Sequence, residues 1–249
     1  MSTLLTNLIS YWKLDEASGN AVDSQGSNTL TNFNTVDFNA GKINNGADFG
    51  SANTNKYLEV SNNLGIDGGV ISMNLWVNIT TIPTSGNVAH LIVQGNNVSK
   101  TINFMRYFND GGTLKIQFSR GKNDVGDQLV QHTYTLTTGT WFMLTYTYDG
   151  TTITAYIDGT SVGTAAASGD GTGVMTFVNG VRLARHTLTG GASYLSGKLD
   201  EVGAWNKTLT ASEVTTLYNG GAGLSYPFTS TANTGAFFAF FLKGYNKYI

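Results

Sequence analysis

The chain has 249 residues, 41% of them hydrophobic, which is enough to bury a core without a disulfide or a metal ion to hold it together. It contains no cysteine, and this excludes thiolate catalysis, disulfide bonds and Cys-ligated zinc. Only 12% of the residues are charged and the formal net charge is −2. With no basic run to grip a polyanion, the composition argues against nucleic-acid binding.

The composition and the short-range patterns favour β-structure. The chain has 31 glycines and only 2 prolines, as expected for short strands joined by tight turns. Leu114, Ile116 and Phe118 alternate with polar residues, which predicts a strand with one face buried and one face wet. The residues 110–112, DGG, predict a hairpin turn just before that strand.

Residues 141–166 read as three antiparallel strands joined at two Asp-Gly dipeptides, 149–150 and 158–159. Turn signals recur at intervals of roughly ten residues, and they predict about twelve to fourteen strands in the whole chain. That spacing is typical of a sandwich or a barrel.

One helix is predicted near the end of this pattern, directly after a strand at 199–205. Thr210 and Glu213 have the spacing of a capping box, which marks a helix N-terminus. Val214, Leu217 and Tyr218 form one apolar stripe at helical spacing. The pair of glycines at 220–221 predicts the left-handed stop.

Five segments carry a resemblance to a known family. In chain order they are LISYWKLDEASGNAVDSQGSNTLT, GADFGSANTNKYLEVSN, VISMNLWVNIT, WFMLTYTYDGTTITAYIDGTSVG and GKLDEVGAWNKTLTASEVTTLYN. Over about residues 8 to 228 the chain resembles a laminin-G-like jelly roll of the concanavalin A-like lectin and glucanase superfamily. The resemblance implies an all-β fold: an antiparallel jelly-roll sandwich of two sheets, one concave, with one short C-terminal helix beside the sheet edge. We therefore divide the chain into a jelly-roll domain, 1–228, and a linker with an aromatic tail, 229–249.

The sequence argues against an enzyme. Glucanases of this superfamily place their acid and nucleophile in E-x-D-x-E or E-x-D-x-x-E motifs, and none of the four glutamates lies in one. Asp200 and Glu201 are adjacent, so on a regular strand they point to opposite faces. There is no G-x-S-x-G motif, and the three histidines have neither an evident acid partner nor metal-ligand spacing: His90, His132 and His186.

The resemblance also implies a structural calcium ion, because members of this superfamily often hold one where the two ends of the domain meet. Calcium prefers six to eight oxygen ligands from loops. The matching positions are Asp23, Asp200 and Glu16, with Asp15 beside them and the carbonyls near Gly26 as further ligands. The alternative is that Asp23 caps a turn and Asp200 accepts backbone amides, as loop aspartates commonly do.

A sugar site needs an aromatic platform with polar side chains around it. The candidates are Arg106, Tyr107, Asn109, Arg182 and His186, and the alternative is that they are ordinary surface residues. The tryptophans lie inside strand motifs and are expected in the core: Trp12, Trp76, Trp141 and Trp205.

The tail is too aromatic to stay in water. We expect it either to add a strand to the sandwich or to dock on a partner through Phe237, Phe238, Phe240 and Phe241. The first residues carry no secretion signal, and no segment has the roughly 20 apolar residues of a membrane span.

Together these features predict a non-catalytic binding or structural protein. We expect a phage virion component, such as a capsid decoration, head fibre or tail-associated adhesin, whose partners are glycans, other virion or surface proteins, or a second copy of the chain. The alternatives are a bacterial cell-surface or secreted lectin-like protein, and a polysaccharide-active enzyme of unrecognised mechanism.

Overall fold

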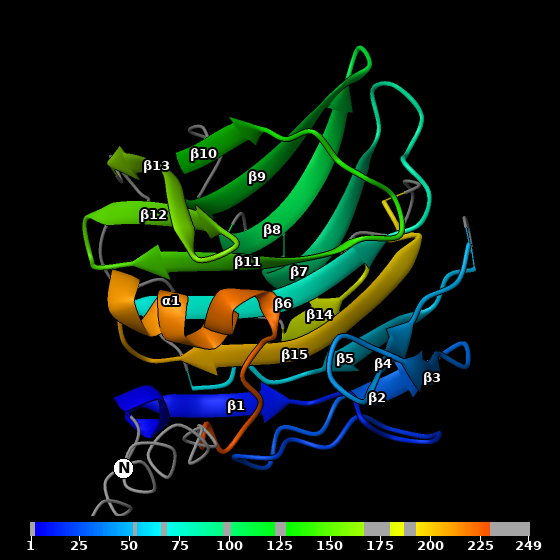
Figure 1. The fold of residues 1–249 in the computed structure, drawn as a ribbon, viewed down its shortest axis with the longest axis horizontal. Coiled ribbons are helices and arrows are strands. Elements are labelled where there is room, and N and C mark those ends of the chain that lie inside the picture. Colours follow the sequence, from blue (N-terminus) through cyan, green and yellow to red (C-terminus); the bar gives the residue numbers. More distant parts are fainter. Residues whose placement is uncertain are drawn as a thin grey trace, which may run out of the picture.

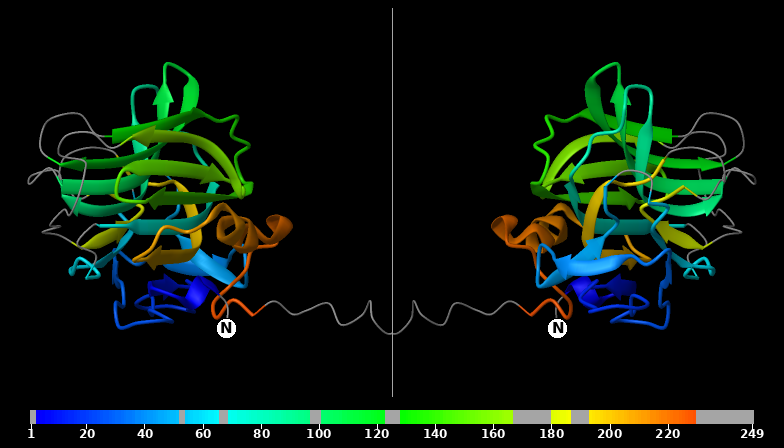
Figure 2. Two further views of the ribbon diagram at one scale, coloured as in Figure 1. Left: turned by 90° about the vertical axis from the view of Figure 1, so that its left-hand side faces the viewer. Right: turned by 90° about the vertical axis from the view of Figure 1, so that its right-hand side faces the viewer.

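A computed structural model describes residues 3–51, 54–65, 69–96, 101–122, 128–166, 180–186 and 193–229. In these ranges the chain forms fifteen β-strands and one α-helix, and the strands make two antiparallel sheets that pack face to face (Figure 1, Figure 2). This confirms the predicted sandwich, with slightly more strands than expected. None of the helical segments in the described ranges has the length and apolar character to cross a membrane. The four phenylalanines of the predicted docking tail lie outside the described residues.

The first sheet has eight strands, in the order β13-β12-β11-β6-β15-β4-β3, with β1 paired to β15 as well. Its strands are β1 (Leu8–Trp12), β3 (Asp37–Ala40), β4 (Asn45–Asp48), β6 (Ile71–Ile79), β11 (Trp141–Tyr148), β12 (Thr152–Ile157), β13 (Thr160–Ala166) and β15 (Gly197–Trp205).

The second sheet has seven strands, in the order β10-β9-β8-β7-β14-β5-β2. Its strands are β2 (Thr31–Phe33), β5 (Tyr57–Val60), β7 (Val88–Asn96), β8 (Thr101–Asp110), β9 (Thr113–Lys122), β10 (Gln128–Thr133) and β14 (Val181–Leu183).

The hairpin turns lie at the glycine-containing positions that the sequence predicts. β8 and β9 pair without a register shift, and Gly111 and Gly112 between them both have positive φ. The β11-β12-β13 meander turns at Asp149-Gly150 and at Asp158-Gly159, as the sequence predicts.

The main core fills the space between the two sheets. Ile116 and Phe118 of β9 are buried there, which confirms the alternation seen in the sequence. Trp12 belongs to the same core, whereas Trp76 and Trp205 are buried in a second cluster. Trp141 is only half-buried and packs against that second cluster.

This second cluster lies on the outer face of the eight-stranded sheet, under helix α1 (Ala211–Tyr218). Val214 and Leu217 of the helix are buried in it, and the Tyr218 ring stacks on the Trp76 ring at a centroid distance of 5.7 Å. The helix therefore covers a sheet face, and the expectation that it packs beside the sheet edge was wrong (Figure 1). The apolar stripe of the helix packs on this face because Trp76 of β6, Met143 of β11 and Tyr156 of β12 form an apolar surface there.

Both ends of the helix are defined by local hydrogen bonds. Thr210 accepts from the Glu213 amide and the Glu213 carboxylate accepts from the Thr210 amide, so the predicted capping box is present. At the other end the left-handed residues begin at Asn219, with φ 49°, and the predicted glycines, Gly220 and Gly221, follow with φ 60° and 91°.

Candidate functional site

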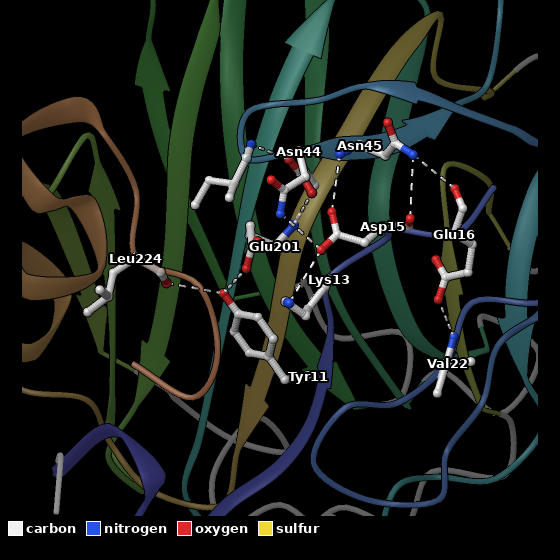
Figure 3. Close-up of polar contacts among 11 residues, drawn as sticks. Tyr11, Lys13, Asp15, Glu16, Val22, Asn44, Asn45, Glu201 and Leu224 are labelled. Atoms are coloured by element: carbon white, nitrogen blue, oxygen red, sulfur yellow. Dashed lines mark hydrogen bonds and ion pairs between the residues drawn. The ribbon is translucent and has the colours of Figure 1, made fainter. Parts of the chain in front are cut away.

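Two regions hold the residues predicted for metal and sugar binding. The first is the junction where β1 meets β15, which contains the residues predicted for calcium. Figure 3 shows two of them, Asp15 and Glu16, with their neighbours. Asp23 is buried, and its carboxylate accepts backbone N–H bonds from Tyr11 (3.0 Å), Gln25 (3.0 Å) and Asn28 (3.1 Å). Gly26 leaves room for this carboxylate, because a Cβ there would lie 2.8 Å from Asp23 Oδ2. Asp23 thus ties its own loop to β1.

Asp200 does the same on β15. Its Oδ2 accepts from the Lys42 and Ile43 amides at 2.7 and 2.9 Å, and its Oδ1 accepts from the Glu201 amide at 2.8 Å. The side chain is fully buried. Burial raises the pKa of Asp200 to about 8, and the amides of Ile43 and Lys42 oppose that rise.

Glu201 departs from the regular alternation of the strand. The register of β15 against β6 shifts between Asp200 and Gly203, and Glu201 has φ 49°. Both neighbouring carboxylates are therefore buried and close enough for Glu201 to raise the pKa of Asp200. The expectation that Asp200 and Glu201 point to opposite faces applies to a regular strand, and this strand is interrupted by a bulge between them and Gly203.

The Glu201 carboxylate lies in a small polar cluster. Its Oε2 accepts from the Tyr11 hydroxyl at 2.6 Å, and that hydroxyl also lies 3.4 Å from the Leu224 carbonyl oxygen (Figure 3). Its Oε1 and the Ser225 Oγ are both buried without a hydrogen-bond partner of normal geometry. Burial raises the pKa of Glu201 to about 7, opposed by the Tyr11 and Ser225 hydroxyls.

Glu16 and Asp15 bind neighbouring loops. Glu16 Oε1 accepts from the Val22 amide at 2.7 Å, and Asp15 Oδ1 accepts from the Asn45 amide at 3.2 Å (Figure 3). Within the described ranges no three acidic or histidine side chains gather as a metal site. The carboxylates of Asp23 and Asp200 each serve three backbone amides, so these residues do not fit a shared calcium ion. The arrangement favours the alternative drawn from the sequence, and calcium binding stays a prediction.

A polar pocket of about 580 Å³ opens beside this junction. Lys13, Lys42 and Ser225 are among its lining residues, whereas Asp200 and Glu201 are not.

The second region is the outer face of the seven-stranded sheet. Four polar residues lie directly opposite one another on neighbouring strands β7, β8, β9 and β10: His90, Arg106, Gln117 and Gln131. We call this row the polar ladder. Arg106 Nε donates to Gln117 Oε1 at 2.6 Å, and Gln117 Nε2 donates to Gln131 Oε1 at 2.7 Å. Because adjacent strands are about 4.8 Å apart, the row extends for roughly 14 Å across the sheet.

The alternation of the strands places the ladder on the outer face. Met105 and Tyr107 flank Arg106 in sequence and lie in the main core, as do Ile116 and Phe118 on either side of Gln117. The ladder side chains must therefore point away from that core.

A second row, with three apolar side chains and one serine, runs beside the ladder. It consists of Val93, Phe104, Ser119 and Leu129, opposed across the same four strands. The Arg106 guanidinium lies over the Phe104 ring at 4.4 Å. Ser119 Oγ is buried without a hydrogen-bond partner. Val93, Phe104 and Ser119 are buried, and within this row only Leu129 is exposed.

Two histidines stand at the β7 end of the ladder. The His90 ring lies 4.6 Å from the His186 ring and edge-on to Phe104 at 5.5 Å. His90 is only 3% exposed, and neither ring nitrogen has a hydrogen-bond partner. Burial lowers the pKa of His90 well below its usual value, and His186 and Arg106 lower it further. Burial, Arg106 and Arg182 lower the pKa of His186 to about 4.

Arg182 joins this group from β14. Its neighbours Val181 and Leu183 lie in the main core, so Arg182 also faces outward. It donates Nε to Glu59 Oε2 at 2.7 Å and Nη1 to the His186 carbonyl at 3.1 Å.

The structure brings together three of the five residues predicted for sugar binding: Arg106, Arg182 and His186. The other two lie elsewhere. The Tyr107 side chain enters the core and donates to the Thr81 carbonyl at 2.9 Å, and Asn109 closes the β8–β9 turn by accepting from the Gly112 amide. Sequence reasoning missed His90, Gln117 and Gln131. Their signal was a polar residue in the outward positions of strands whose inward positions are apolar.

A comparison with models of protein families shows to which family the chain is related. Residues 51–215 match the model of the laminin-G-like family described as the concanavalin A-like lectin/glucanases superfamily, which is more than half of the chain. The chain belongs to this superfamily. No curated protein matches the sequence.

Solved structures share the fold at low identity. Domain 4 of AbnA, an extracellular arabinanase from Geobacillus stearothermophilus solved with arabinotriose, has a TM-score of 0.63 and 17% identity, covering 84% of this chain and 97% of that domain. The binding domain of botulinum neurotoxin DC, solved with SialylT, has a TM-score of 0.69 and 14% identity, covering 88% of this chain and 52% of that one. The chain therefore spans about half the length of the toxin binding domain. At these identities the likeness shows the fold alone.

Proposed function

We propose that this protein is a non-catalytic saccharide-binding module that holds a glycan along the polar ladder. The observation that carries the proposal is the row of His90, Arg106, Gln117 and Gln131 with the buried, unpartnered nitrogens of His90 at its end. An unpartnered buried polar group costs about 1–3 kcal/mol, and a bound hydroxyl group would recover that energy. Because His90 is only 3% exposed, a ligand reaches it when the side chains that cover it move aside. The fold supports this reading, because an arabinanase domain solved with arabinotriose shares it.

The chemistry of the ladder supports binding without catalysis. No ladder residue is a carboxylic acid, and the nearby Glu59 carboxylate is paired with Arg182. Glycoside hydrolysis needs two carboxyl groups that flank the scissile bond. Asp200 and Glu201, the adjacent carboxyl pair, are buried in the other sheet.

Replacing His90 by phenylalanine is expected to weaken saccharide binding at least tenfold without lowering the Tm. The substitution keeps a flat ring but removes both ring nitrogens, so it deletes the bonds to a ligand and also the cost of burying them unpartnered. A glycan array followed by calorimetric titration of the best ligand measures the first effect, and thermal unfolding measures the second.

His132→Phe provides the matched control. His132 is the next residue along β10 from Gln131, and it points to the opposite side of the strand. Its substitution should leave binding unchanged. Equal losses in the two variants, or full binding by His90→Phe, would place the saccharide site away from the ladder.

We further propose that the module acts on the surface of a virion, as a phage capsid decoration, head fibre or tail-associated adhesin. The support is the composition of residues 229–249, whose four phenylalanines and two tyrosines suit docking to another virion protein or to a second copy. A bacterial cell-surface or secreted lectin-like protein is the alternative place for the same module.

Deleting residues 230–249 is expected to turn an oligomer into a folded monomer. The aromatic side chains would supply the contact, and the sandwich would keep its own core. Size exclusion with light scattering gives the mass, and the Tm shows whether the core is intact. If the full chain and the truncated chain are both monomers, self-assembly through the tail is wrong.

A further inference from the structure

Two lysines line the polar pocket of about 580 Å³ at the β1–β15 junction, and the described residues that line it include no aspartate or glutamate. Lys13 directly follows β1, and Lys42 lies in the turn between β3 and β4. The loop after helix α1, residues 222–227, forms much of the remaining wall. A cleft whose charges are all positive attracts anions and raises their local concentration.

Both lysines are only partly buried, so a ligand in the pocket can reach them. Lys13 Nζ lies 3.4 Å from Asp15 Oδ2, in a pair whose side chains are 33% and 27% exposed (Figure 3). Such a pair contributes less than about 1 kcal/mol, so an anionic ligand can compete with Asp15.

Lys42 forms no ion pair with a carboxylate of the described ranges. Its Nζ lies 4.5 Å from the Trp76 ring centroid. Burial raises the pKa of Asp158 and the Lys42 ammonium opposes that rise, but the two groups are not in contact as an ion pair. The ammonium is therefore placed by an aromatic ring and keeps its hydrogen-bond donors for a ligand.

The rest of the wall adds donors and acceptors. In the described part of the chain the backbone amides of Leu224, Ser225 and Tyr226 donate to no acceptor. Asn44 and Asn219 also line the pocket, and no donor of the same ranges reaches the Oδ1 atom of either. Amide N–H groups suit an anion, and amide oxygens suit hydroxyl groups.

The kind of charge and the size of the pocket point to one class of ligand. An ammonium group binds an anion as a point charge, which makes lysine a common partner of phosphate. Two ammonium groups match the charge of a phosphate monoester, about −1.5 to −2 near pH 7. A phosphate ion alone would fill a small part of the pocket, whose volume is typical of sites for organic ligands.

We infer that this pocket binds a small phosphorylated sugar, whose phosphate is held by Lys13 and Lys42. The sugar hydroxyls bond to the two asparagines and to the loop after α1. The pocket belongs to the eight-stranded sheet and the polar ladder to the seven-stranded one, so the inference does not rest on the proposed saccharide-binding function.

The test is a calorimetric titration of the full chain at pH 7 and low salt with glucose 6-phosphate, glucose and inorganic phosphate. We expect glucose 6-phosphate to bind at least tenfold more tightly than either of the other probes. Lys13→Gln and Lys42→Gln should each weaken this binding at least fivefold without lowering the Tm appreciably. Lys115→Gln is the matched control, because it removes the same charge from β9 of the other sheet, and it should leave the affinity unchanged.

Three results would overturn the inference. If inorganic phosphate binds as tightly as glucose 6-phosphate, the pocket holds an anion and not a phosphorylated sugar. If Lys115→Gln weakens binding as much as the two pocket variants do, the attraction is one of overall charge. If glucose 6-phosphate does not bind at millimolar concentration, or both folded pocket variants bind it like the wild type, the pocket is not its site. His90→Phe should leave glucose 6-phosphate binding intact, so the failure of one proposal does not decide the other.

Discussion

Replacing Asp200 by alanine is expected to destabilise the fold by about 3–5 kcal/mol, whether or not calcium is present. The variant leaves the buried amides of Lys42, Ile43 and Glu201 without their acceptor. Each such donor costs about 1–3 kcal/mol when it stays unpartnered. Urea unfolding of wild type and variant gives the difference in the free energy of unfolding.

Asp149→Ala is the matched control. Asp149 also accepts backbone amides, from Thr151 and Thr152, but it does so in an exposed turn where water can replace it. We expect it to cost about 1 kcal/mol or less. The calcium hypothesis is tested with the same proteins after chelator treatment. A rise in Tm of the wild type at millimolar calcium that is absent in Asp200→Ala would show that Asp200 is a metal ligand after all.

Replacing Glu201 by glutamine is expected to have the opposite effect and to stabilise the fold by about 1–3 kcal/mol above pH 7. Glu201 has its pKa raised from 4.5 to about 7 because burial penalises the charged form. Glutamine keeps an acceptor for the Tyr11 hydroxyl and carries no charge to bury. Its amide can also donate to the unpartnered Ser225 Oγ.

The sign of the pH dependence follows from that shift. Between about pH 4.5 and pH 7 the folded protein keeps the proton on Glu201, whereas the unfolded chain releases it. Unfolding therefore becomes easier as the pH rises through this window, and wild-type stability falls there. The advantage of Glu201→Gln should be small at pH 4.5, grow through the window and level off above it.

Thermal unfolding at half-unit steps from pH 4.5 to 8.5 measures this profile. Asp37→Asn serves as the control, since Asp37 is an exposed carboxylate paired with Lys56 and should contribute less than about 1 kcal/mol at any pH. A Glu201→Gln variant that is less stable than wild type at pH 8 would mean that the ionised carboxylate stabilises the fold.

Local signals in the sequence predicted the elements well. The Asp-Gly turns, the alternation at Leu114, Ile116 and Phe118, and the capping box at Thr210 each depend on residues a few positions apart. The placement of the helix was wrong because it depends on Trp76, Met143 and Tyr156, which come from three strands distant in sequence.

The candidate site was predicted only in part, for the same physical reason. Arg106 stands next to His90 and Gln117 through pairing across strands, and this register cannot be obtained from any one segment. Tyr107 was predicted as an aromatic group of the sugar site, but the alternation of β8 directs its side chain into the core. The bulge at Glu201 has no signal of its own, because a glutamate with positive φ is not predicted by its residue type.

The position of β15 has a consequence for how the protein folds during synthesis. β15 pairs with β6, β4 and β1, so it joins three parts of the eight-stranded sheet that come from the first third of the chain. Until residue 205 has left the ribosome, those strands lack their common neighbour, and their open edges can pair with other chains. The eight-stranded sheet is therefore incomplete until this late strand has been synthesised. Conditions that slow translation before that point should favour aggregation over folding.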